Sequence, residues 1–190
     1  MKTALLACTL LLLSHVYANE PLWHSLNVAG VQVEYQAASA AELSQVNDVL
    51  RRAVDQLQRR PELLLCPSVV VTVHPDLATF QAATGAAWYQ LAVADRAGCR
   101  IDMQRLPVVA QHGGLEATLR HELFHLAQPA GWERWRAEGE AQRFAGELPR
   151  ERPLGGLNSR QLDRLLEAPT DQATYRRSMA TALEWVMQGR

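Results

Sequence analysis

The segment from Leu115 to Gly146 constrains the fold more than any other part of the chain. In its first half, leucines recur at three- and four-residue intervals: Leu115, Leu119, Leu123 and Leu126. Side chains at these intervals share one face of an α-helix, so the pattern is typical of an amphipathic helix packed on a core. The Gly113-Gly114 pair breaks the chain just before it. We therefore predict a helix that starts after these glycines.

Residues 121–125 of this helix read His-Glu-Leu-Phe-His. His121 and His125 lie one turn apart, so their imidazoles project in the same direction. Two imidazoles placed in this way can bind one zinc ion, and Glu122 lies on the flank where a zinc-bound water would be. The alternative is that both histidines are ordinary surface or core residues of an amphipathic helix.

A zinc site that catalyses a reaction needs a third protein ligand and one open position. We predict Glu138 as that ligand, on a second helix over residues 132–146, because the break at residues 128–131 can fold this helix back. Gly139 would let the two helices approach closely, and Trp135 is expected to hold them together. Glu140 and Glu133 are the alternative ligands. Glu140 points about 200° around the helix from Glu138, so only one of these two can face the metal.

These residues carry a family resemblance. The His121-Glu-x-x-His125 motif, followed by Trp135-x-x-Glu138-Gly139-x-Ala141, resembles the gluzincin metallopeptidases, and more narrowly the small bacterial peptidase MA-like domains. In zinc aminopeptidases of that clan, the second motif provides the third zinc ligand, which the resemblance assigns here to Glu138. It also implies a zincin-like order of elements: a strand, a long helix, a mixed sheet and then the motif helix. The interval between His125 and Glu138 is shorter than in the large aminopeptidases.

A zinc ion would give Glu122 a chemical role. Zinc lowers the pKa of its bound water to about 7, and Glu122 would then accept a proton and pass it to the leaving amine. The alternative for Glu122 is a salt bridge to Arg120 or Arg134. The hydrogen-bond partners that orient the two histidines are not identified by the sequence, although Glu116 or Asp102 could serve.

The oxyanion formed during hydrolysis needs a donor besides the metal. We predict Tyr175, which follows the motif on a later helix, and related peptidases often use a tyrosine or histidine there. Its spacing with Met179 and Leu183 also fits the apolar face of that helix, so core packing is the alternative. His112, just before the motif helix, is a second candidate donor.

The amino terminus predicts export. Met1-Lys2, the apolar run from Ala4 to Leu13 and the small-residue site Val16-Tyr17-Ala18 form a signal peptide, cleaved after Ala18. Residues 19–190 are expected to form a single domain in the periplasm or outside the cell, without stable insertion in a membrane. The formal net charge of −1 and the lack of a basic patch argue against nucleic acid as a partner. The sequence leaves the oligomeric state open.

Cleavage would remove Cys8 and leave Cys66 and Cys99. An even pair of cysteines in an oxidising compartment predicts a disulfide, and two separate buried thiols are the alternative. In either case, the cysteines take no part in the chemistry.

The order of predicted elements indicates an α+β fold in which a small mixed sheet and a long amino-terminal helix precede a helical half. The predicted strands cover residues 28–36, 69–73, 88–94 and 99–103, after an irregular stretch to Asn27. The predicted helices cover 39–60, 76–84, 115–127, 132–146, 159–166 and 173–187, and residues 106–109 are ambiguous. Ser39 and Glu42 are expected to form a capping box at the start of the long helix.

Together these features predict an exported peptidase with one Zn²⁺ per chain, bound by His121, His125 and Glu138. It would hydrolyse peptide or protein substrates with Glu122 as general base. The alternatives are a zinc-stabilised binding or assembly factor of the cell envelope without turnover, and an amidase that acts on peptidoglycan peptides.

Overall fold

The structure is a computed structural model that describes residues 22–28, 31–37 and 40–190. The predicted signal peptide and the predicted cap residue Ser39 lie outside the described residues. Strands in the described part are β1 (Leu22–Val28), β2 (Val31–Ala37), β3 (Ser68–Val73), β4 (Ala92–Asp95) and β5 (Arg100–Met103). Helices are α1 (Ala40–Gln58), α2 (Leu77–Thr84), α3 (Leu106–His112), α4 (Leu115–Ala127), α5 (Arg134–Ala145), α6 (Ser159–Glu167) and α7 (Gln172–Met187). The predicted α+β class is confirmed.

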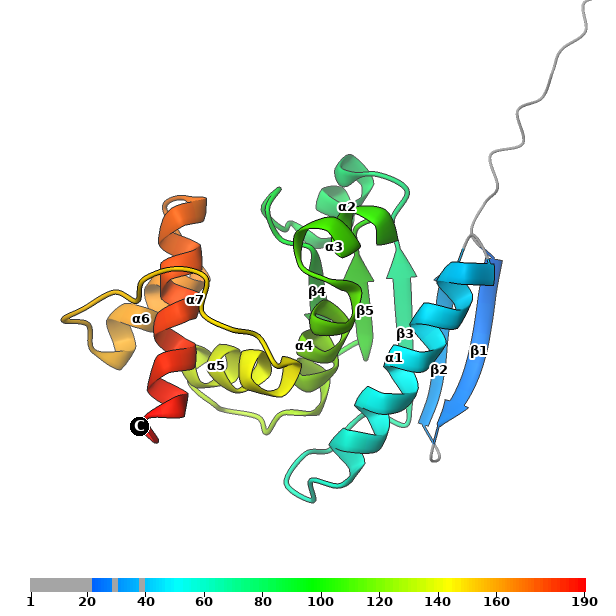
Figure 1. The fold of residues 1–190 in the computed structure, drawn as a ribbon, viewed down its shortest axis with the longest axis horizontal. Coiled ribbons are helices and arrows are strands. Elements are labelled where there is room, and N and C mark those ends of the chain that lie inside the picture. The colour runs from blue at the N-terminus through cyan, green and yellow to red at the C-terminus, as the bar shows by residue number, and fades with distance from the viewer. Residues whose placement is uncertain (1–21, 29–30, 38–39) are drawn as a thin grey trace, which may run out of the picture.

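The strands form one mixed sheet in the order β1-β2-β3-β5-β4. The central pairs β2–β3 and β3–β5 are parallel, and the outer pairs β1–β2 and β4–β5 are antiparallel. Helices α1 and α4 cover one face of this sheet, while α5, α6 and α7 lie beside it (Figure 1). Strand β4 is therefore an edge strand, and it lies next to α4, the helix that carries the histidine motif.

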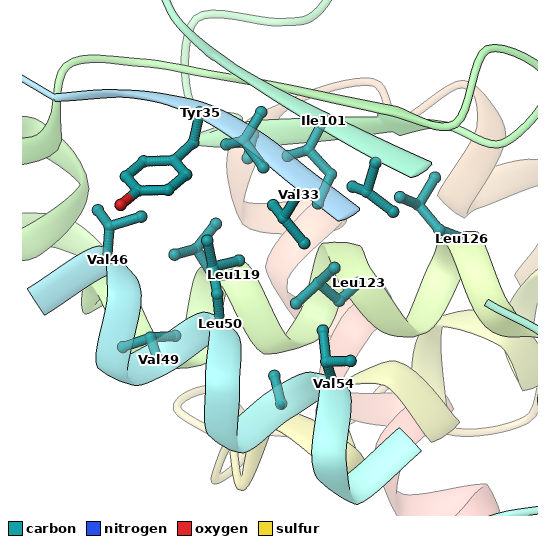
Figure 2. Close-up of a cluster of buried hydrophobic side chains, with 14 of the residues drawn as sticks. Val33, Tyr35, Val46, Val49, Leu50, Val54, Ile101, Leu119, Leu123 and Leu126 are labelled. Carbon is teal, nitrogen blue, oxygen red and sulfur yellow. The ribbon is translucent and has the colours of Figure 1, made fainter. Parts of the chain in front are cut away.

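The main core lies between the sheet and the helices α1 and α4. Figure 2 shows Leu50 and Val54 of α1 facing Leu119 and Leu123 of α4, with Val33 of β2 above them. All five side chains are fully buried. The leucine spacing that predicted α4 is therefore the spacing of its core contacts, and the opposite side of α4 is left for polar residues.

Two segments of the sheet differ from the prediction. The predicted irregular stretch up to Asn27 is wrong, because residues 22–28 form β1 and pair with β2 in an antiparallel hairpin. Leu26 of β1 is buried, and His24, two residues earlier on the same face, packs on Tyr35 with ring centroids 5.7 Å apart. The polar residue His24 interrupts the apolar alternation that predicts a strand, so the periodic signal in the sequence is weak.

The predicted strand over residues 88–94 is correct only in its second half, because β4 begins at Ala92. The segment before β4 bonds to Gln104 instead of forming a ladder. The Gln104 side-chain amide donates to the carbonyl of Gln90 at 2.7 Å, and its backbone N–H donates to the carbonyl of Leu91 at 2.9 Å. The ambiguous segment at residues 106–109 belongs to helix α3.

The predicted disulfide between Cys66 and Cys99 is present, with Cα atoms 6.1 Å apart. Cys66 and Cys99 shortly precede β3 and β5, which are parallel neighbours in the sheet. The bond therefore links the two segments that enter the sheet at the same edge. Among the helices described, none is long and apolar enough to cross a membrane.

Candidate metal centre

Three side chains converge where α4 meets α5. The Nε2 atoms of His121 and His125 lie 3.0 Å apart, and Oε2 of Glu138 lies 3.2 Å from the first and 3.4 Å from the second. Zinc–ligand distances of about 2.0–2.2 Å in a tetrahedron require donor atoms about 3.3–3.6 Å apart. The three donors are therefore close to the spacing that zinc needs, and these residues could hold a metal ion.

Helix α5 brings Glu138 to the histidines because a second helix packs tightly behind it. A Cβ at Gly139 would lie 2.4 Å from the carbonyl oxygen of Ala182 and 2.6 Å from Cγ2 of Val186, both on α7. Gln142 adds a hydrogen bond from its amide to the carbonyl of Met179 at 2.9 Å. The expected close approach at Gly139 is thus present, but its partner is α7 and not the motif helix.

Trp135 does not hold α5 on the motif helix as expected. It is buried in a second hydrophobic cluster of α5, α6 and α7, and packs on Trp185 with ring centroids 5.4 Å apart. The contact with α4 comes instead from two aromatic residues, one before and one after Trp135 in the sequence. Phe124 of α4 packs against Trp132 at 6.1 Å and against Phe144 at 5.5 Å between centroids.

Each of the three candidate ligands is oriented through its other polar atom. The Nδ1 atom of His121 lies 3.0 Å from a carboxylate oxygen of Glu147, and Nδ1 of His125 lies 3.1 Å from the amide oxygen of Gln128. The second oxygen of Glu138 accepts from the guanidinium of Arg134 at 2.6 Å. A proton donated from Nδ1 leaves the Nε2 lone pair free, which is the tautomer that a metal-binding histidine needs.

Glu116 and Asp102, the two acids named as candidates to orient the histidines of the motif, do not contact them. Glu116 pairs with Arg52 at 3.0 Å, and Asp102 pairs with His74 at 2.8 Å on the sheet. Glu147, which takes the expected role, was not predicted. It follows the left-handed residue Gly146 that ends α5, and its backbone N–H donates back to the carbonyl of Gln142 at 2.9 Å. A glycine at a helix end was the available signal, since it turns the next residue back toward the helix.

The alternative third ligands lie elsewhere. Glu140 pairs with Arg143 at 2.5 Å, and Glu133 accepts a hydrogen bond from the indole nitrogen of Trp135 at 3.0 Å. Neither belongs to the group of donors around His121 and His125. The structure therefore brings together the predicted set and excludes both alternatives from it.

Glu122 lies beside the donors and is 8% exposed. Burial, opposed by the neighbouring histidines, raises the pKa of its carboxyl above the usual 4.5. The predicted alternative, a salt bridge to Arg120 or Arg134, is not formed, because these arginines pair with Glu116 and Glu138. The carboxylate is thus held in a setting where it binds a proton more readily than a free glutamate does.

The charges around the histidines keep Glu138 ionised. Burial alone would raise its pKa, but His125, Arg134 and His121 together hold the pKa of Glu138 well below 4.5. For His121, burial lowers the pKa while hydrogen bonds to Glu138 and Glu147 raise it well above 6.5. A cation at this position would compete with the imidazole proton, so metal binding there releases a proton.

Two cavities meet at this group. The large cavity has a volume of about 890 Å³ and the small cavity about 210 Å³, and both are lined by His121, Glu122 and Tyr175. Burial, with a contribution from the charges of Glu138 and Glu122, raises the pKa of the Tyr175 phenol, so the hydroxyl stays protonated. His112 lines only the large cavity. Tyr175 therefore reaches the cavities as the oxyanion prediction requires, and its role stays a prediction.

No family model matches this sequence, and no curated protein matches it either.

Proposed function

We propose that the protein is a zinc-dependent metallopeptidase of the gluzincin type. The observation that carries the proposal is the convergence of His121, His125 and Glu138 on one point, each with its other polar atom already bonded. Donors fixed in this way lose little entropy when they bind an ion, and two imidazoles with one carboxylate are a common donor set for catalytic zinc. When bound, zinc would supply the Lewis acid that activates water and polarises a peptide carbonyl.

The residues of the chain provide the remaining steps. Glu122, with its raised pKa, accepts a proton from the attacking water and delivers it to the leaving amine. Tyr175 donates its hydroxyl hydrogen to the oxygen that becomes negatively charged at the carbonyl. Both side chains line the two cavities that meet at the donors, so a substrate bound across them would contact both.

Strand β4 supports a peptide as the substrate. It is the last strand of the sheet, so one side of its backbone has no partner strand in the described fold. Ala92 of β4 lines both cavities, and Val93 and Ala94 line the small one. An extended peptide could therefore add to this edge through backbone hydrogen bonds and pass the candidate metal centre. We also propose that residues 1–18 direct export of the protein.

Metal analysis tests the proposal first. Purified protein, reconstituted with zinc, is expected to contain about one zinc per chain. Glu138→Ala should lose the metal, while the matched variant Glu140→Ala, two residues away on the same helix, should keep it. Absence of zinc from the wild-type protein after reconstitution would refute the proposed function.

A second variant separates binding from catalysis. Glu122→Gln should keep the zinc and lose hydrolysis of unfolded protein substrates, because the amide cannot accept the proton. Zinc bound by the wild-type protein without hydrolysis of any peptide would favour the zinc-stabilised binding factor instead. Digestion of purified sacculi alone, with no cleavage of unfolded protein, would favour the peptidoglycan amidase.

A further inference from the structure

Two arginines line the large cavity. Arg150, in the connection between α5 and α6, and Arg176, on α7, both line this cavity together with His121 and Glu122. Arg176 directly follows Tyr175, the predicted oxyanion donor, on α7, and both line this cavity. Both arginines are exposed, so their charged groups reach solvent within the cavity.

Neither guanidinium is neutralised by an acidic side chain. In the described part of the chain, the ion pairs of arginine involve other residues, and Arg150 donates only to the backbone carbonyl of His112, at 3.3 Å. By contrast, Arg134 and Arg143 on neighbouring α5 each pair with a glutamate. Arg150 and Arg176 are therefore available to bind an anionic group.

Three carboxylates line the same cavity. Glu122 lies beside the candidate ligands, Glu147 accepts from His121, and Glu151 is exposed. The Asp171 carboxylate at the start of α7 accepts from the backbone N–H and hydroxyl of Thr174. None of these carboxylates forms an ion pair with Arg150 or Arg176 in the described structure.

Two more arginines lie on the same two segments. Arg177, next to Arg176, donates from Nε to the backbone carbonyl of Arg152 at 3.3 Å. This contact joins the segment that carries Arg150 to the helix that carries Arg176.

We propose that Arg150 and Arg176 bind a carboxylate of the substrate, so that the site selects acidic peptides. The inference rests on the proposed peptidase function for cleavage, whereas binding of the carboxylate needs only the cavity. A guanidinium binds a carboxylate through two parallel hydrogen bonds, which gives direction as well as charge attraction. Trp88 and Leu148, 60% and 81% exposed, line the same cavity and provide apolar surface for the neighbouring part of the peptide.

The carboxylate has two possible sources, an acidic side chain or the free carboxyl terminus. Four fluorescent alanine-based peptides of equal length distinguish these two sources. They carry glutamate or glutamine at the same position, and each sequence has either a free or an amidated carboxyl terminus. The Glu122→Gln protein prevents turnover during the anisotropy measurement. Peptides with the recognised carboxylate are expected to bind about tenfold more tightly than matched peptides without it, and this difference in affinity should become smaller in high salt.

Two double variants carry the test. Arg150→Gln with Arg176→Gln should abolish the preference for acidic peptides. Arg160→Gln with Arg164→Gln removes the same charge from two exposed arginines of α6 that do not line the cavity, and should leave the preference unchanged. Equal binding of all four peptides, or a preference for a carboxylate that survives the first double variant, would overturn the proposal. Acid-selective binding without hydrolysis by the wild-type protein would refute the peptidase and leave the anionic subsite standing.

Discussion

Gly139→Ala tests whether the contact between α5 and α7 places the third candidate ligand. The added Cβ would lie 2.4 Å from the carbonyl oxygen of Ala182, where an ordinary carbon–oxygen contact is about 3.3 Å or longer. A backbone oxygen within a helix cannot rotate away as a side chain can. Helix α5 must therefore move by roughly 1 Å relative to α7 to relieve the overlap.

Two opposing effects set the size of the change. Alanine favours a helix interior over glycine by about 1 kcal/mol. Overpacking of a dense contact costs about 1–3 kcal/mol, and the upper end applies here because Val186 Cγ2 also lies within 2.6 Å. We expect a net loss of about 2 kcal/mol in the free energy of unfolding. For a protein of this size, the loss lowers the melting temperature by about 4–8 °C.

Thermal unfolding of metal-free protein measures this loss, and chelator competition measures zinc affinity. Since Glu138 precedes Gly139, a shift of α5 should also weaken zinc binding. Gly155→Ala is the matched control, because its Cβ would meet nothing within 4 Å, and its expected change is within about 0.5 kcal/mol. The reasoning is refuted if Gly139→Ala melts at or above the wild-type temperature, because α7 would then not fix the position of α5.

Three further predictions test other parts of the structure. Glu147→Ala should lower zinc affinity by about 10–100-fold in chelator competition, because His121 loses its orienting acceptor, while Glu151→Ala should not. Replacing Cys66 and Cys99 by serine should lower the free energy of unfolding in urea by about 3–4 kcal/mol, the chain-entropy value for a separation of 33 residues; unchanged unfolding midpoints would contradict this. Hydrogen bonds from Thr174 lower the pKa of Asp171 below 3.8, so its stabilisation is complete above that value and is lost as pH falls through the folded pKa. The difference in stability between wild type and Asp171→Asn should therefore stay constant above about pH 5 and fall progressively as the pH drops through 3.8 and then through the folded pKa.

The elements that could be predicted from sequence are those with a strong local pattern. The leucines of α4 and the valines of α1 repeat at helical spacing, and both helices lie where the periodicity places them. Strand β1 was missed because His24 interrupts the alternation of apolar residues, while its pairing with β2 relies on backbone hydrogen bonds that leave no pattern in the sequence.

The candidate site shows the same difference between residues placed by local spacing and residues placed by tertiary contacts. The two histidines and Glu122 could be placed together because they lie within five residues of one helix, where geometry follows from sequence spacing alone. Glu147 and Arg134 were not anticipated in their roles, because each depends on how α5 ends or faces another helix. Such contacts are set by tertiary packing, and no interval in the sequence encodes them.

The charges at the site favour a divalent cation as its occupant. The carboxylates of Glu122, Glu138 and Glu147 lie close to two histidines, and Arg134 is the guanidinium paired with this group. Without a metal, a proton on His121, whose pKa is raised, offsets part of this negative charge. Once both imidazoles are neutral, as metal binding requires, the carboxylates exceed the guanidinium by two negative charges, and such charge is costly where it is buried. A single divalent ion among the three donors would balance that excess and would also join α4, which packs in the sheet core, to α5, which packs on α7. The same ion would therefore satisfy the electrostatics of the site and link the two hydrophobic clusters of the fold.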